Sequence, residues 1–177
     1  LTPRALGEEV FGPGEIKLNA YATVEVTPRI TAQIVKRHTR LGALVHRGQP
    51  LVTLSSVEMS GAQGEMVIAE REWQRVRKLG KKVVSERRYL EARVAREQAR
   101  ARVLAFGMTK KQSAKILRGS PADANGTFTL LAPQDGIVIA DEFHVGEFVE
   151  PGRMLFRITN GGVRWVQARL APHDVVK

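Results

Sequence analysis

The sequence predicts an α+β protein: a small β-sandwich made from two copies of one short motif, with an antiparallel pair of helices inserted between them. Residues 32–54 and residues 136–158 align without a gap at a constant offset of 104. Each copy has a β-branched run, two glycines and a closing apolar run, a pattern typical of half-buried strands joined by turns. One copy is too short to bury its own apolar face, so the two copies are expected to pack together.

The correspondence between the copies holds at individual positions. Because glycine recurs at the same turns, both copies need backbone geometry that residues with a Cβ resist. We expect the copies to be related by a rotation of about half a turn, with Leu54 beside the strand around Phe128 in spite of the long insertion. The aligned pairs are Gly42 with Gly146, Gly48 with Gly152, Val45 with Val149, and Leu51 with Leu155.

The sequence of the insertion predicts three helices, over residues 56–79, 85–106 and 109–118. In the first, apolar residues recur at alternating steps of three and four, which is the spacing of a seam against a second helix. Each helix has a polar cap residue at its start and a glycine beyond its end. The caps are Ser55, Ser85 and Thr109, of which the first and last form capping boxes with Glu58 and Gln112, and the glycines are Gly80, Gly107 and Gly119.

The first two helices are expected to form an antiparallel hairpin in which Trp73 lies near Ala92. Gly61 and Gly64 lie inside the first helix, where each costs roughly 1 kcal/mol relative to alanine. We expect the alanine-rich part of the second helix to approach the backbone closely at these glycines and so to compensate their cost.

Further strands are expected outside the repeat. Residues 15–26 alternate loosely and predict one strand, residues 127–131 predict a second, and residues 163–170 predict a third. The composition of residues 119–126 predicts a loop.

The chain carries a formal net charge of +10, and its basic residues are concentrated in the insertion. Residues 71–118 contain 16 Lys and Arg against 4 Glu, a local net charge of +12. A basic segment of this kind raises the possibility of nucleic-acid binding. The basic residues are spread around the helices without aromatic neighbours, and no nucleic-acid-binding motif is present. A solvated surface that faces an acidic partner is therefore the better interpretation.

No arrangement for bond chemistry stands out in the sequence. There are no cysteines, which excludes disulfides and thiolate metal sites. Met59 and Met66 lie on the helical seam, so we interpret them as core residues rather than ligands for a soft metal. We expect neither an enzyme nor a bound cofactor or metal. The histidines, which are neither paired nor spaced as ligands, are His38, His46, His144 and His173.

The pattern that runs from Ile34 through Gly42 and Gly48 to Leu51 resembles one half of a lipoyl or biotinyl carrier domain. A carrier joins its halves by a tight hairpin that bears a modified lysine, whereas this sequence places helices there. A split lipoyl domain with an inserted helical hairpin resembles the periplasmic adaptors, or membrane fusion proteins, of tripartite RND-type efflux pumps in the HlyD-like family. Residues 54–63 are similar to the heavy-metal efflux branch of that family.

The resemblance implies five segments. Residues 1–26 are a lead-in with one strand of a partial β-barrel, and residues 160–177 return to that barrel. The lipoyl half-motifs cover residues 27–54 and 127–159. The α-helical hairpin with its short third helix covers residues 55–119.

The resemblance also implies a docking site at the hairpin tip, where Arg75, Leu79 and Ser85 match the residues by which these adaptors contact an outer-membrane channel. The other implied partners are an inner-membrane RND-type transporter and further copies of the chain, in a hexameric ring or a trimer of dimers. The implied location is the periplasm, with anchorage to the inner membrane through a segment outside this sequence. For the heavy-metal branch the implied cargo is heavy-metal cations such as zinc or cobalt, and a non-metal substrate stays open.

Two other functions stay open on the sequence. A true lipoyl or biotinyl carrier is the first, and it would contain a modified lysine that mass spectrometry of the native protein detects. A basic helical nucleic-acid-binding protein is the more distant second, and it would bind DNA at physiological salt.

Overall fold

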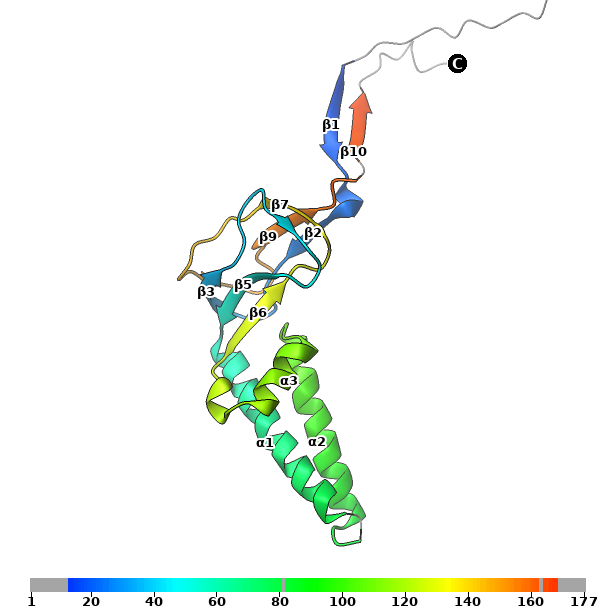
Figure 1. Cartoon of the computed structure of the whole chain (residues 1–177), viewed down its shortest axis with the longest axis vertical. Coiled ribbons are helices and arrows are strands. Elements are labelled where there is room, and N and C mark those ends of the chain that lie inside the picture. The colour runs from blue at the N-terminus through cyan, green and yellow to red at the C-terminus, as the bar shows by residue number, and fades with distance from the viewer. Residues whose placement is uncertain (1–12, 81, 163, 169–177) are drawn as a thin grey trace, which may run out of the picture.

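The computed structural model describes residues 13–80, 82–162 and 164–168, and it shows an elongated molecule with three parts in a row (Figure 1). A helical hairpin forms one end, a sandwich of two four-stranded sheets forms the middle, and a two-stranded ribbon forms the other end. The expected α+β class, with a helical insertion in a β-sandwich, is confirmed. No helix in the described ranges combines the length and hydrophobicity of a membrane span.

The sandwich consists of two antiparallel sheets, and each sheet combines strands from both halves of the sequence. One sheet has the order β2-β9-β7-β4, and the other has the order β6-β5-β3-β8. The strands are β2 (Thr23–Val26), β3 (Ala32–Arg37), β4 (Leu44–Val45), β5 (Pro50–Ser55), β6 (Thr127–Leu131), β7 (Gly136–Ala140), β8 (Phe148–Val149) and β9 (Phe156–Thr159).

The two sheets correspond strand by strand through the offset of the repeated motif. Exchanging β2 with β6, β3 with β7, β4 with β8 and β5 with β9 turns one strand order into the other. The hydrogen bonds of the turns are equivalent in the two halves. The Gly42 N–H donates to the Val138 carbonyl at 2.8 Å, and the Gly146 N–H donates to the Ile34 carbonyl at 2.7 Å. Both glycines have positive φ, of 77° and 93°. The repeat therefore builds one domain, as predicted.

Arg37 and Asp141 occupy equivalent positions of the two motifs and bind each other. The Arg37 Nη1 atom lies 2.6 Å from Asp141 Oδ2, which also accepts from the Leu41 N–H at 3.2 Å. The guanidinium carbon lies 4.2 Å from the centroid of the Phe143 ring. Because equivalent residues can meet only near the axis that relates the halves, this pair marks that axis.

The single strand expected over residues 15–26 is wrong, because a turn divides it. β1 (Gly14–Leu18) is followed by a 3-10 turn at Ala20–Ala22 and then by β2. Asn19 caps the turn by accepting from the Tyr21 N–H at 2.9 Å, which redirects the chain from the ribbon into the sandwich. β1 pairs with β10 (Arg164–Ala168), the described part of the strand expected over residues 163–170.

The predicted strand at residues 127–131 is confirmed as β6, and it pairs Phe128 with Leu54 of β5. The loop expected over residues 119–126 is only partly correct. It contains a short 3-10 helix, Pro121–Asp123, which Ser120 and Asp123 close with a reciprocal capping box.

The insertion forms three helices, α1 (Val57–Leu79), α2 (Glu86–Ala105) and α3 (Lys110–Arg118). Ser85 caps α2 as predicted, and Thr109 caps α3. The capping box predicted at Ser55 is wrong, because Ser55 is the last residue of β5 and pairs with strands on both sides. Ser56 is the N-cap of α1 instead. It makes no side-chain cap bond, and its Oγ is buried without a partner among the described residues.

The first two helices pack in the predicted antiparallel register. Trp73 and Ala92 belong to one buried cluster with Val76 and Val84. The Trp73 ring meets the Tyr89 ring edge-on, with 5.0 Å between the ring centroids.

Gln63 joins the hairpin to the sandwich. Its fully buried side chain accepts from the Gly126 N–H at 2.9 Å and donates to the Thr127 carbonyl at 3.0 Å. Gln112 of α3 donates to the Thr129 carbonyl at 2.9 Å. Both α1 and α3 are therefore tied to β6, which fixes the direction of the hairpin relative to the sandwich.

The explanation expected for Gly61 and Gly64 is wrong. A Cβ added to either residue would have no neighbouring atom within 4 Å, so α2 does not approach the backbone there. Met59, Ala62 and Met66 take the buried positions of α1, and the two glycines fall between them, away from the seam. Their cost to the helix has no compensation within the described chain.

Gly61→Ala and Gly64→Ala should each raise the free energy of unfolding by roughly 0.5–1 kcal/mol. Neither glycine has positive φ, and an added methyl group meets open space, so alanine reduces the entropy lost on folding without a clash. Denaturant unfolding measures the change. Ala62→Gly, on the buried face of the same helix, is the control and should destabilise. If neither alanine variant is stabilised, the space around the glycines is not open.

Candidate docking site at the hairpin tip

A short turn connects α1 to α2 at the far end of the hairpin. Gly80 follows the last helical residue with a φ of 77°, and its N–H donates to the Val76 carbonyl at 3.1 Å. Its own carbonyl accepts from the N–H groups of Val83 and Val84, both at 3.1 Å. Ser85 then begins α2, since its Oγ accepts from the Arg88 N–H at 3.3 Å. The turn is held by hydrogen bonds at both ends.

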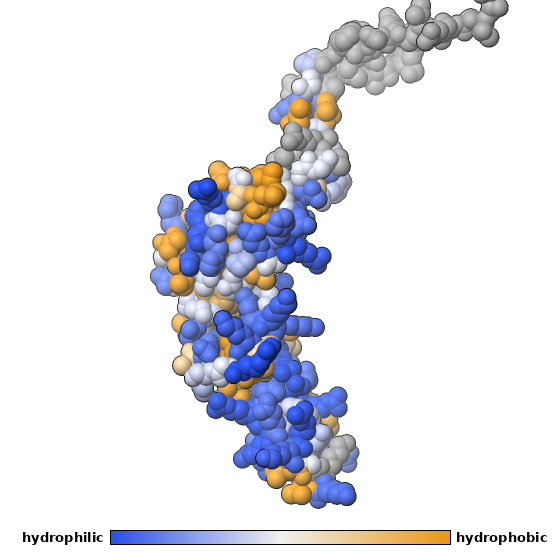
Figure 2. All heavy atoms as spheres, in the orientation of Figure 1, coloured by the Kyte–Doolittle hydropathy of each residue, from blue (hydrophilic) through white to orange (hydrophobic). Residues whose placement is uncertain are grey.

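This turn places two neighbouring valines in opposite environments. Val84 is buried in the cluster with Trp73, whereas Val83 is 73% exposed. Leu79, at the end of α1, is 51% exposed. Figure 2 shows hydrophobic atoms at this end of the hairpin among hydrophilic ones. Val83 is a docking candidate that the sequence pattern missed, because the helical period does not continue through a turn.

Arg75 and Ser85, the polar residues of the expected site, both have partners within the tip. Arg75 forms an ion pair with Glu72, and Glu72 also binds Arg88 of α2 at 3.2 Å. The hydrogen bonds from Arg88 and then from Arg75 hold the pKa of Glu72 below its ordinary value. The Arg75 side chain is still 64% exposed. Arg75, Leu79 and Ser85 thus lie at one end of the hairpin, open to solvent.

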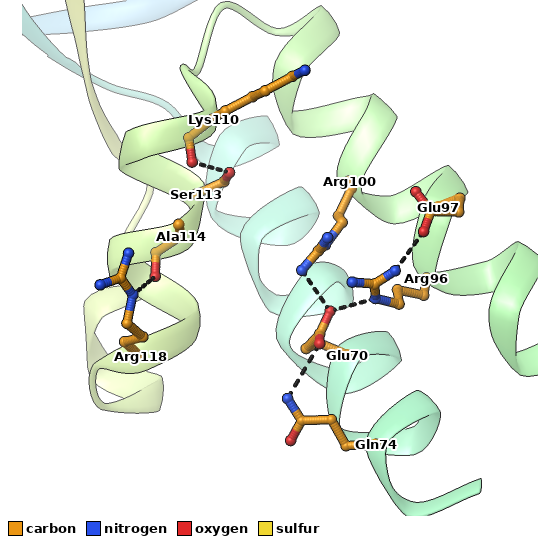
Figure 3. Close-up of polar contacts among 9 residues, drawn as sticks. All are labelled: Glu70, Gln74, Arg96, Glu97, Arg100, Lys110, Ser113, Ala114 and Arg118. Atoms are coloured by element: carbon orange, nitrogen blue, oxygen red, sulfur yellow. Dashed lines mark hydrogen bonds and ion pairs between the residues drawn. The ribbon is translucent and has the colours of Figure 1, made fainter. Parts of the chain in front are cut away.

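Below the tip, a buried carboxylate ties the two helices together (Figure 3). Glu70 is 7% exposed and binds Arg96 at 2.7 Å and Arg100 at 2.9 Å, both from α2. Gln74 donates to its other oxygen at 3.2 Å. Burial alone would raise the pKa of Glu70, but the hydrogen bonds from Arg96 and Gln74 and the charge of Arg100 outweigh it, and the pKa is lowered.

Glu70→Gln should lower the free energy of unfolding by about 1.5–3 kcal/mol at neutral pH, because two arginines lose a charged acceptor. The folded-state pKa of Glu70 lies below its unfolded value of 4.5. The carboxylate therefore stabilises the fold above that value, and this contribution is lost as the pH falls through the folded-state pKa. The difference in unfolding free energy between wild type and Glu70→Gln should shrink toward acid.

The control for this pH dependence is Glu91→Gln, which removes an exposed ion pair with Arg87 on α2. It should change the unfolding free energy by less than about 0.5 kcal/mol at neutral pH. A Glu70→Gln difference that stays constant or grows toward acid would contradict the lowered pKa.

The histidines give no sign of a metal site. In the described part of the chain, no three His, Asp or Glu side chains gather as they would around a metal ion. His173 lies outside the described residues. Met59 and Met66 are buried in the core, as predicted.

The sequence resembles proteins of metal resistance. Residues 22–160 match the family described as CzcB-like, barrel-sandwich hybrid domain. The cobalt-zinc-cadmium resistance protein CzcB of Cupriavidus metallidurans is 26% identical over 171 residues, which cover 92% of this chain and 32% of that protein. The nickel and cobalt resistance protein CnrB of the same organism is 26% identical over 178 residues, covering 96% of this chain and 44% of that protein. The chain therefore spans less than half the length of these relatives.

Two solved structures share the fold. The crystal structure of ZneB from Cupriavidus metallidurans matches with a TM-score of 0.54 and 20% identity, over 93% of this chain and 71% of that one. A MacA-MexA chimeric protein containing the Pseudomonas aeruginosa MexA alpha-hairpin domain matches with a TM-score of 0.53 and 20% identity, over 94% of this chain and 59% of that one. At these identities the likeness is one of fold alone.

Proposed function

This chain belongs to the CzcB-like barrel-sandwich hybrid family, and we propose on that premise that it is the sandwich and hairpin part of a periplasmic adaptor. In this role it links an inner-membrane RND-type transporter to an outer-membrane channel, and the assembly exports heavy-metal cations. The chain works by packing and docking, and it makes or breaks no covalent bond.

The observation that carries the proposal is the hairpin tip. α1 has 23 residues, so at the rise of an α-helix it holds the tip roughly 34 Å beyond the sandwich. There Leu79 and Val83 expose apolar side chains in a strongly basic segment. Apolar groups at the end of a charged arm favour contact with another protein. We propose Arg75, Leu79 and Ser85, together with Val83, as the residues that contact the channel.

Two sets of buried polar contacts along the hairpin, made by Gln63 and Glu70, support a bridging role. Gln63 fixes the base of α1 to β6, and Glu70 binds two arginines of α2 midway to the tip. An arm held at both places keeps the tip at a constant distance and direction from the sandwich. A bridge between two membrane proteins requires that constancy.

The remaining parts of the proposal concern place and assembly. The chain lies in the periplasm, held to the inner membrane by a segment outside this sequence. Its copies form a ring, either a hexamer or a trimer of dimers. The cargo is proposed from the relatives, which are resistance proteins for cobalt, zinc and cadmium and for nickel and cobalt.

The two-fold topology of the sandwich also suits a lipoyl or biotinyl carrier. Between β5 and β6, where a carrier has its lysine-bearing hairpin, this chain has α1, α2 and α3. That arrangement favours the adaptor. A modified lysine found by mass spectrometry of the native protein would favour the carrier.

A chimera tests the proposed function. Residues 22–160 of this chain replace the matched region of a CzcB-type adaptor, in a strain without an adaptor of its own. Growth is then measured against cobalt, zinc and cadmium salts, beside strains with the intact adaptor and with none. We expect resistance well above that of the strain with none. A chimera that is folded and present in the periplasm but confers no resistance would refute the proposed function.

A further inference from the structure

The side of α1 that faces away from α2 exposes two large apolar side chains. Val57 is 90% exposed and Ile68 is 71% exposed. Gly61 and Gly64 lie between them in the sequence, and the spacing of the four residues places them on one helix face. We call these four residues the α1 ridge. Because the glycines have open space around them, another backbone can approach the ridge closely at its middle.

A groove of about 390 Å³ runs between α2 and α3. Ala101 and Leu104 of α2 and Ala114 and Leu117 of α3 provide its apolar lining. We call it the α2–α3 groove. It is open to solvent on a part of the hairpin that α1 does not cover, so it can receive a side chain from outside.

The ridge and the groove lie at the same height along the hairpin. The ion pair between Glu65 of α1 and Arg102 of α2 shows which parts of the two helices are level. By that register, residues 61–68 of α1 are level, within one turn, with residues 97–104 of α2. A rotation about an axis parallel to the hairpin, without any shift along it, can therefore bring the ridge of one copy to the groove of the next.

The charges beside the two surfaces are complementary in order. Arg71 continues the ridge toward the tip, and Glu58 lies beside the ridge toward the sandwich. Both are exposed and without an ion pair to any described residue. Along the groove, Lys110 lies toward the sandwich and Glu97 toward the tip. Glu97 also pairs with Arg96 of its own helix, and Arg100, which lines the groove as well, is bound to Glu70. With two copies level and pointing the same way, an acid faces a base at both ends. With one copy reversed, like charges would face each other.

We propose that the α1 ridge of one copy packs into the α2–α3 groove of the next copy, and that this contact repeats around a ring. Because two different surfaces meet, the interface is head-to-tail, and rotation closes it into a ring. The inference rests on the ring in the proposed function and names the surfaces that build it. It also explains Gly61 and Gly64, since close approach of a neighbouring copy compensates the cost that α2 does not.

Single-cysteine variants test this interface on a background that contains no cysteine. Ile68→Cys and Ala101→Cys are purified separately, mixed over a series of concentrations and oxidised. We expect a disulfide-linked dimer in the mixture and none with either variant alone. The variant with both cysteines should give a ladder of multimers. In the control mixture, Gln98→Cys replaces Ala101→Cys, because Gln98 is at a similar height but lines a different groove, between α1 and α2. No dimer is expected there.

Charge reversal tests the orientation. Arg71→Glu, added to Ile68→Cys, should reduce dimer formation with Ala101→Cys by roughly threefold, and Glu97→Arg in the partner should restore it. Dimers from a single variant alone, equal dimers with Gln98→Cys, or no dimers in the Ala101→Cys mixture would each overturn the interface. The resistance of the chimera is scored separately: cross-linking without resistance would overturn the adaptor function and leave the interface supported. Resistance without cross-linking would overturn the interface alone.

Discussion

Gln63→Leu should lower the free energy of unfolding by about 2–6 kcal/mol, because it leaves a buried N–H and a part-buried carbonyl without partners. The Gln63 side chain is 0% exposed, and it satisfies both the Gly126 N–H and the Thr127 carbonyl at the junction of hairpin and sandwich. Leucine keeps much of the volume of glutamine but offers neither an acceptor nor a donor. Each unsatisfied group costs about 1–3 kcal/mol. Urea denaturation of the whole chain measures the loss.

The matched control is Gln98→Leu, which makes the same chemical change at an exposed position of α2. It should alter the unfolding free energy by less than about 0.5 kcal/mol. A loss below about 1 kcal/mol for Gln63→Leu would mean that water reaches the junction and replaces the missing bonds. The rigid attachment of the hairpin would then need another explanation.

Arg75→Gln combined with Leu79→Ser should abolish metal resistance in the chimera while the melting temperature falls by no more than about 1–2 °C. Both side chains are exposed, so the fold depends little on them. Glutamine removes the positive charge at position 75 without adding a negative one. An aspartate there would place a second carboxylate beside Glu72. With glutamine there, Glu72 keeps its ion pair with Arg88.

Two controls separate docking from folding. Arg77→Gln removes an equal charge from an exposed position near the tip and should leave resistance unchanged. Trp73→Ala should lower the unfolding free energy by about 3–5 kcal/mol, because it empties the buried cluster behind the tip. Full resistance of the Arg75→Gln, Leu79→Ser variant would remove the docking role and leave the tip as an ordinary helix end.

The fold was predictable because its signals are local and repeated. Glycines with positive φ at Gly42 and Gly146 fix equivalent turns, and Thr109 with Gln112 forms a complete capping box from four neighbouring residues. The predictions from sequence were wrong where contacts with distant chain segments determine the local structure. Ser55 carries a cap signal, yet it continues β5 because strands on both sides pair with it. The local sequence pattern around Ser55 does not indicate which strands pair with it.

The candidate docking site was predictable in part for the same reason. Arg75 and Leu79 could be placed near the tip, since helix length and a terminating glycine determine where the tip lies. Val83 could not be distinguished from Val84, because only the folded turn decides which of them meets the Trp73 cluster. Glu70 escaped notice because a carboxylate in an apolar seam depends on arginines that α2 supplies from 26 and 30 residues further along the chain.

Binding of the hairpin tip to an outer-membrane channel is measured most directly by co-purification. The chimera is tagged, the membranes are solubilised, and the amount of channel retained is determined with the native tip and with Arg75→Gln and Leu79→Ser combined. The native tip should retain the channel, and less of it as salt rises, because the tip is basic and the salt screens its charges. The double variant should retain none. Equal retention of the channel by the double variant and the native tip would contradict docking through these residues.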